Sequence, residues 1–211
     1  MGLNLLAIPL LLLINPVFAP GPVFAASAVL SFLALWRVPA KVDREELKLG
    51  FFGLVMGTAF AGALATAIDS ESFARLLGLF VILGVGLALS GWSAPINRRN
   101  LIVAGGGAGF LGTIAGPHGP PIVLLYQGLE PDRVRGATLT FIGTGNTLSL
   151  IALLLIGRFG TEQLMAAIIL APGVLVGLFV APRLAQLIDA RLLRSIVLAI
   201  SAISGFFLMI G

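Results

Sequence analysis

The residues best suited to chemistry lie in one short stretch, Gly116 to Pro121, which reads GPHGPP and contains the only histidine of the chain. Its three prolines have no backbone N–H, and its two glycines favour conformations outside the helix. Both flanks are apolar, so the stretch breaks a helix inside a hydrophobic context. Unpaired backbone groups at membrane depth occur only where protein or a water-filled cavity satisfies them. The break therefore predicts the wall of a binding site.

The chemistry that this break favours is the binding of an anion. A short helix that begins near Gly119 would direct its first N–H groups and the positive end of its dipole into the gap. Hydroxyl, imidazole and amide groups near the break add side-chain donors. The run around Pro9 resembles the run around Pro121 at an offset of 112, so the region from Asn4 to Pro9 is expected to face the break. The predicted substrate-binding residues are Asn4, Thr113, Gly116, His118, Gly119, Pro120, Thr144 and Asn146.

Simpler interpretations exist for several of these residues. His118 is also explained as a histidine that satisfies backbone carbonyls in an irregular turn. Thr140, Thr144 and Thr147 are also explained by hydroxyls that bond back to the preceding helical turn, which is common in membrane helices. Arg135 at a helix start is explained as a topology determinant, with attraction of anions as the alternative. These alternatives remain open at the level of sequence.

The remaining residues argue against an enzyme and against a metal site. The apolar spans contain no Asp, Glu, Lys or Arg well away from an end, so an intramembrane hydrolase would lack its acid, base or nucleophile. A metal site needs several ligands, and the chain has one histidine and no cysteine. We expect no catalytic residue, no metal and no cofactor.

Composition places the chain in a membrane. Of its 211 residues, 58% are hydrophobic and 10% are charged, whereas a soluble domain averages about 25% charged residues. The excess of 13 Lys and Arg over 9 Asp and Glu is explained by cytoplasmic loops, not by nucleic-acid binding. The apolar run from Leu3 lacks a preceding basic region and contains Pro9, so we interpret it as part of the mature protein and not as a signal peptide.

Apolar runs and polar loops alternate along the chain, which is typical of an all-α polytopic membrane protein. About seven to eight membrane segments are expected, and the segments Leu101–Ala115 and Pro120–Tyr126 form a broken, re-entrant pair. The expected full or shorter spans are 3–15, 23–36, 49–68, 73–92, 137–156, 165–182 and 192–210.

The two halves of the chain resemble each other. An offset of 120 aligns the pair Gly53 and Gly57 with Gly173 and Gly177, and it aligns residues 68–69 with 188–189, which are Ile-Asp in both places. Chance matching of short motifs is the alternative, but the order of the spans also matches. We therefore predict two transmembrane repeats, residues 1–97 and residues 98–211.

The basic residues predict the topology. If crossings alternate from Leu3 and the broken pair returns to its starting side, one face collects eleven Lys and Arg residues and the other keeps Arg75 and Arg158. This bias marks the first face as cytoplasmic. The second repeat is then inverted relative to the first, as in many secondary transporters with discontinuous helices. We expect a multi-pass protein of the inner (plasma) membrane with a periplasmic carboxyl terminus. The eleven residues are Arg37, Lys41, Arg44, Lys48, Arg98, Arg99, Arg133, Arg135, Arg183, Arg191 and Arg194.

The combination of these motifs resembles the TauE/SafE family of sulfite exporters, also called the TSUP permeases. The resemblance is carried by GFLGTIAGPHGPPIVLLYQGLEPDRVRGATLTFIGTGN in the second half and by GLNLLAIPLLLL, VDREELK and the GxxxG span in the first, so it covers nearly the whole chain. It implies transport of sulfite, sulfonates or related organosulfur anions, and a first half without its leading glycine-rich helix. His118 stands where the family often has glycine. The matching residues are Gly116, Pro117, Gly119, Pro120, Pro121, Arg135 and Asn146.

Together these observations predict a secondary transporter that moves a small anion, sulfite or an organosulfonate, through a midplane site at broken helices. Export of a monoanion needs no coupling ion, because an inside-negative potential supplies about 2.3 kcal/mol per 100 mV. Uptake would instead couple to a proton through His118. The expected partners are the anionic substrate and the lipid bilayer, with a homodimer also considered, and no nucleic acid.

The alternative is a non-transporting membrane subunit that scaffolds partners through its glycine faces at Gly53/Gly57 and Gly173/Gly177. That alternative predicts a dry, packed break and no phenotype confined to anions.

Overall fold

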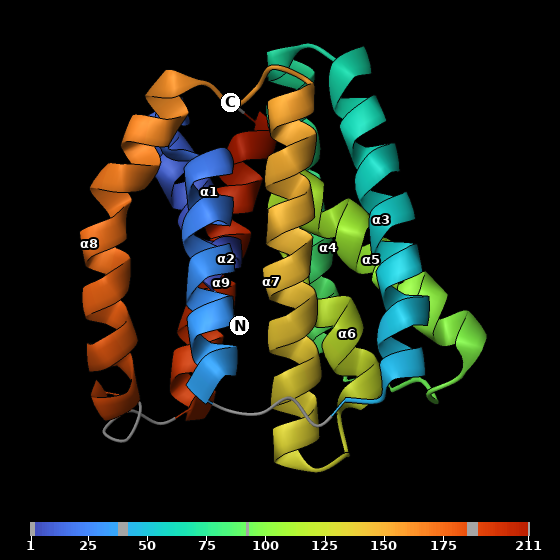
Figure 1. Ribbon diagram of the computed structural model, residues 1–211. Coiled ribbons are helices and arrows are strands. Elements are labelled where there is room, and N and C mark those ends of the chain that lie inside the picture. The colour runs from blue at the N-terminus through green and yellow to red at the C-terminus, as the bar shows by residue number, and fades with distance from the viewer. Residues whose placement is uncertain (1–2, 38–41, 92, 185–189, 211) are drawn as a thin grey trace.

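The computed structural model describes residues 3–37, 42–91, 93–184 and 190–210, and within these ranges all regular structure is helical (Figure 1). This confirms the all-α class. Three residues named above lie outside the described residues: Ile188 and Asp189 of the repeat match, and Lys41 of the charge count. The elements are α1 (Leu3–Ile14), η1 (Pro16–Phe18), α2 (Gly21–Arg37), α3 (Arg44–Ala67), α4 (Ser70–Leu89), α5 (Arg98–Ala115), α6 (Gly119–Tyr126), α7 (Pro131–Leu155), α8 (Thr161–Leu184) and α9 (Ala190–Ile210).

Local sequence accounts for the helix ends that matter most for the site. Asp43 caps α3 by accepting hydrogen bonds from the amides of Glu45 at 2.7 Å and Glu46 at 3.3 Å. Gly116 ends α5 in the left-handed conformation, with φ of 95°, and its N–H bonds to the carbonyl of Gly112 at 2.8 Å. The prolines that follow then start α6, where a missing N–H costs little.

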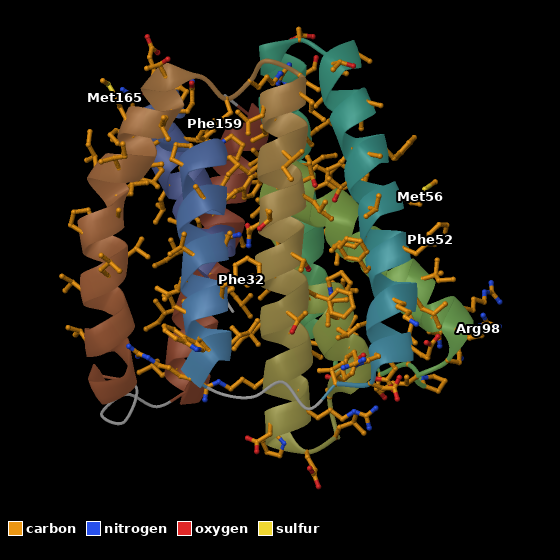
Figure 2. All side chains as sticks on the ribbon, in the orientation of Figure 1. Phe32, Phe52, Met56, Arg98, Phe159 and Met165 are labelled. Atoms are coloured by element: carbon orange, nitrogen blue, oxygen red, sulfur yellow. The ribbon has the colours of Figure 1, made fainter. Side chains whose placement is uncertain are left out.

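Several helices have the length and apolarity of membrane spans. Among the described residues, three stretches are long and apolar enough to cross a bilayer: Pro16–Arg37, Arg44–Ala67 and Pro131–Leu155. Shorter apolar stretches occur at Arg75–Leu89, Thr161–Gly177 and Ser195–Phe207. Figure 2 shows large apolar side chains that project outward, among them Phe52 and Met56 of α3 and Met165 of α8, each more than half exposed. Such surfaces suit lipid and not water.

The broken pair forms a hairpin. α6 packs against α5 and runs back toward the end of the bundle where α5 begins (Figure 1). The amide of Ala94, which precedes α5, bonds to the carbonyl of Leu124 near the end of α6 at 3.3 Å. The pair therefore enters the bundle and returns to its starting side, as the charge count requires. The inverted relation of the two halves and the number of crossings stay predictions.

The contact between α3 and α5 is the closest helix packing around the hairpin. A Cβ added at Gly53 or Gly57 of α3 would overlap the backbone of α5 near Ile102 or Gly106. A Cβ at Gly109 of α5 would likewise overlap the backbone of α3 near Leu54. Small residues allow this approach, which substitutes for a hydrophobic driving force between membrane helices. The glycine face of α3 is therefore used inside the molecule.

Different contacts hold the two ends of the bundle. At the end that we call the basic end, Glu46 at the start of α3 accepts a hydrogen bond from Tyr126 at the end of α6 and one from Arg133 at the start of α7, at 3.0 and 2.6 Å. At the opposite end, Arg158 donates to the carbonyl of Ile68 at 3.3 Å. Arg133 and Arg158 thus lie at opposite ends of α7, the separation that the predicted topology requires.

Candidate functional site

His118 lies at the centre of the break and is 1% exposed. Its Nδ1 lies 3.1 Å from the carbonyl oxygen of Gly116, and its Nε2 lies 3.1 Å from Oγ of Ser149. Because a carbonyl only accepts, Nδ1 is the donor to Gly116, and Nε2 of the neutral ring is the acceptor from Ser149. The edge of the ring also meets Phe24, with centroids 5.9 Å apart and planes at 79°. The imidazole is therefore held in one orientation.

Two glycines make room for this ring. A Cβ at Gly112 of α5 or at Gly145 of α7 would overlap the His118 imidazole. The glycine-rich composition around the break therefore has a local cause, because the helices must approach within the width of one aromatic ring. Gly112 and Gly145 therefore lie on either helix against the imidazole of His118, the only histidine of the sequence.

Hydroxyl groups extend the cluster behind the ring. Oγ of Ser149 lies 2.7 Å from Oγ1 of Thr113, which in turn lies 3.3 Å from Oγ1 of Thr58. All three side chains are at most 5% exposed. The hydroxyls thus connect the histidine to α7, α5 and α3 in turn.

Two asparagines join the amino-terminal helix to the break. Asn4 Nδ2 donates to the carbonyl of Gly116 at 3.2 Å and to Oδ1 of Asn146 at 2.8 Å. Its Oδ1 accepts from Ser27, while Asn146 Nδ2 donates to the carbonyl of Ile142 at 2.7 Å. Asn4 and Gly116 are 112 residues apart, the offset at which the run around Pro9 resembles the run around Pro121. The break and its counterpart at the start of α1 therefore lie in contact.

The structure brings most of the predicted site residues together. Asn4, Thr113, Gly116, His118 and Asn146 belong to one buried polar cluster, which we call the central cluster together with Ser27, Thr58 and Ser149. Gly119 and Pro120 follow His118 directly as the first residues of α6.

Thr144 lies apart from the central cluster. Its hydroxyl donates to the carbonyl of Thr140 at 2.7 Å, as in the simpler interpretation of the threonines. Its side chain lines a depression of about 230 Å³ beside Lys48 and Phe51. Thr144 therefore faces α3 and not the histidine.

Sequence reasoning missed three members of the central cluster: Ser27, Thr58 and Ser149. A signal existed for Ser149, since it follows Gly145 by four residues and so lies on the same face of α7. Ser27 and Thr58 lie in apolar helices far from the break in sequence, and only the packing of α2 and α3 brings them to it.

The central cluster offers neutral donors. It contains amide, hydroxyl and imidazole groups and no charged side chain, and no group of three or more His, Asp or Glu with metal-binding geometry occurs among the described residues. The start of α6 offers fewer backbone N–H donors than a helix start of ordinary composition. Pro120 and Pro121 are two of its first three residues, and proline has no N–H. The side chains must therefore supply most of the donors for a bound anion.

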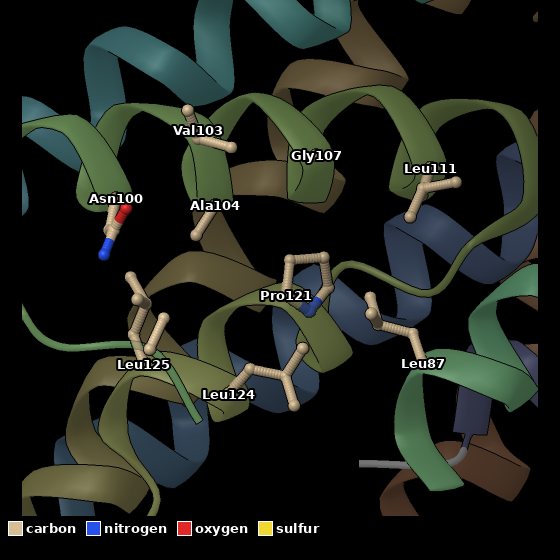
Figure 3. Close-up of a pocket in the computed structure, with 10 residues that line it drawn as sticks. Leu87, Asn100, Val103, Ala104, Gly107, Leu111, Pro121, Leu124 and Leu125 are labelled. Carbon is tan, nitrogen blue, oxygen red and sulfur yellow. The ribbon is translucent and has the colours of Figure 1, made fainter. Parts of the chain in front are cut away.

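A groove and a depression lie outside the central cluster. Figure 3 shows a separate apolar groove of about 210 Å³ between α5 and α6, with Asn100 at one end and Leu87 of α4 at the other. Neither this groove nor the depression at Thr144 is lined by His118 or Asn146. The amide groups of Asn4 and Asn146 and Nδ1 of His118 all donate to oxygens of the protein.

Comparison with protein families decides the relationship. The family described as "Sulfite exporter TauE/SafE" matches residues 1–208. The chain belongs to this family. The resemblance drawn from the GPHGPP break and its flanks is therefore confirmed. In the comparisons with curated proteins and with solved structures, nothing matches.

Membership in the TauE/SafE family, together with the apolar helices, makes this a multi-pass membrane protein of a transporter family. That agrees with the expectation that the chain is not an enzyme. The family also suggests a small anionic substrate.

Proposed function

We propose that this member of the TauE/SafE family is a secondary carrier that passes a small sulfur oxyanion, sulfite or a short sulfonate, across the inner membrane through the central cluster. One observation carries the proposal: buried donors from both halves of the chain converge on the break, with Asn4 contributed by the first half and His118 and Asn146 by the second. Buried polar groups are costly in an apolar bundle, and ionisable groups there mark substrate pathways.

An anion would bind by exchanging partners with the protein. The amide Nδ2 groups of Asn4 and Asn146 now donate to protein oxygens. When the break opens, these groups turn toward the oxygens of the guest, and the Ser149 hydroxyl leaves the imidazole to do the same. Neutral donors hold an anion less strongly than a buried cation would. A carrier benefits from this weaker hold, because it must release its substrate at the other side.

We further propose that the basic end faces the cytoplasm and that the direction of transport is export. The end with Arg133 collects most of the basic residues of the sequence, in accordance with the positive-inside rule. The central cluster has no carboxylate that would carry a coupling proton. Export of a monoanion is driven by the membrane potential alone, at about 2.3 kcal/mol per 100 mV.

Counterflow of labelled sulfite in proteoliposomes tests the proposal. Wild-type protein should exchange sulfite, and Asn146→Ala should reduce the exchange at least about tenfold, since it removes a hydrogen bond to charge worth about 1.5–3 kcal/mol. His118→Ala should also reduce the exchange, because it removes the ring that positions the Ser149 hydroxyl and bonds to the Gly116 carbonyl. Thr147→Ala is the matched control, because the Thr147 hydroxyl bonds back to Gly143 at 2.9 Å one residue away from Asn146. Sulfate and short sulfonates serve as competitors. If no sulfur anion is exchanged, the proposed substrate is wrong. If the Thr147 variant loses as much exchange as the His118 and Asn146 variants, the proposed binding site is wrong.

A further inference from the structure

Thr138 differs from the other threonines of α7. The hydroxyls of Thr140, Thr144 and Thr147 each donate to the carbonyl four residues earlier, at 2.7 to 2.9 Å. Thr138 is 2% exposed, and its Oγ1 has no hydrogen-bond partner in the part of the chain that the structure describes. A buried hydroxyl without a partner destabilises the fold, so a functional role is one explanation for its presence.

The position of Thr138 points to that use. Thr138, Gly145 and Ser149 are separated by seven and four residues, so they lie on one face of α7. Gly145 and Ser149 contact His118, and Thr138 lies about 10 Å from Gly145 along the helix, on the side of the basic end. The unpartnered hydroxyl therefore lies on the face of α7 that leads from the central cluster toward Arg133.

A second polar cluster closes the basic end of this face. Glu46 of α3 accepts from Arg133 Nη2 at 2.6 Å and from the Tyr126 hydroxyl at 3.0 Å. The Glu46 side chain is 15% exposed, and Tyr126 is fully buried. One carboxylate thus ties the end of α6 and the start of α7 to the start of α3. We call these three residues the Glu46 cluster.

The Glu46 cluster also bounds an apolar plug. Leu54, Ile122 and Phe141 are each at most 2% exposed and pack in the same core as Tyr126. These residues come from α3, α6 and α7, the helices that the Glu46 carboxylate holds together. At this end α6 packs against α7 and is joined to α3 by the hydrogen bond between Tyr126 and Glu46.

We propose that the substrate route between the central cluster and the basic end follows the Thr138 face of α7, that Thr138 donates to the anion in transit, and that the Glu46 cluster is the gate of this route. The proposal rests on the proposed carrier function. It assigns Thr138 a contact with substrate and Glu46 a positioning role that acts through Tyr126 and Arg133.

The absence of cysteine from the sequence makes the route measurable. Thr138→Cys introduces a single thiol of similar size, and a small, membrane-impermeant, anionic methanethiosulfonate reagent then reports access to it. The variant is reconstituted in vesicles and labelled separately from each side. Labelling should be slow, should occur from the basic end, and should become slower in the presence of a short alkanesulfonate, which, unlike sulfite, does not react with the reagent or with the disulfide formed.

Glu46→Gln should then raise the rate of labelling from the basic end roughly tenfold, which corresponds to a gate weakened by about 1.4 kcal/mol. Glu45→Gln is the matched control. Glu45 is in the same turn, its amide also bonds to Asp43, and its carboxylate pairs with Lys48 at 2.6 Å on the exposed surface. Tyr126→Phe removes only the hydroxyl and should give a smaller rise, which separates gating from loss of fold.

Three results overturn the route: equal labelling rates in the Glu46→Gln and Glu45→Gln variants, faster labelling from the opposite end, or equal acceleration from both ends, which would indicate general loosening. Failure of the carrier proposal looks different. If no sulfur anion is exchanged and the alkanesulfonate does not protect the thiol, but labelling remains one-sided and dependent on Glu46, the proposed substrate is wrong and the gated route stands.

Discussion

Helices α3 and α8 carry glycine pairs with the same spacing, but only the pair on α3 packs closely against another helix in the described structure. Side chains added at Gly53 and Gly57 of α3 would collide with the backbone of α5, whereas a Cβ added at Gly173 or Gly177 of α8 would meet no atom of the described residues within 4 Å. The sequence pattern is the same in both halves. A GxxxG spacing therefore makes close packing available, and a partner with its own small residues decides whether it happens.

The partner of α3 explains the difference. α5 contains GGGAG, and its Gly105 would place a Cβ onto the carbonyl of Gly50, so both helices contribute to the close approach. α8 exposes large apolar residues such as Ile169 and Val176 around its glycines, as a lipid-facing helix does. The packing of the glycines on α3 and on α8 can each be tested by substitution.

The largest effect is expected at the α3–α5 contact. Gly57→Leu should lower the free energy of unfolding by at least the roughly 1–3 kcal/mol typical of overpacking, because the new side chain meets rigid backbone at Gly106. Gly177→Leu on α8 is the matched variant and should change it little. The measurement is the thermal unfolding midpoint of the purified protein in detergent. Equal shifts for the two variants would contradict the comparison.

An intermediate effect is expected where a glycine faces a side chain instead of backbone. Gly145→Ala should displace the His118 ring and reduce sulfite counterflow, while stability falls by about 1–3 kcal/mol or less, since a side chain can move where backbone cannot. Gly107→Ala is the control, because its new Cβ would lie 3.7 Å from Pro121, an ordinary contact. A Gly145 variant with normal counterflow would show that the orientation of the ring is unimportant for transport.

The smallest effect is expected on α8. Gly173→Ala should leave counterflow unchanged and should raise stability by up to about 1 kcal/mol, the gain in helix propensity when Ala replaces Gly. Unfolding midpoints in detergent and in reconstituted bilayers provide the measurement. A marked loss of stability confined to the bilayer would mean that another helix, such as that of a second copy, covers this face there.

Much of the fold follows from local sequence. Apolar run lengths predicted the helices to within a few residues, apart from longer polar starts such as Arg44 of α3 and Pro131 of α7. The GPHGPP break was predictable because proline and glycine act through backbone geometry, which needs no partner. The family was predictable for the same reason, since the resemblance was drawn from such breaks and spacings, and the family match over residues 1–208 confirmed it.

The sequence by itself thus determined the helices, the break and the presence of His118 within it. Tertiary structure decided which polar groups meet there: Asn4 and Asn146 share a hydrogen bond across 142 residues, while Thr144, two residues from Asn146, bonds back to its own helix. The physical reason is that backbone preferences are local, whereas the partner of a side chain depends on how helices rotate and approach. Small residues set that approach, and only the packed bundle shows which of them have a partner.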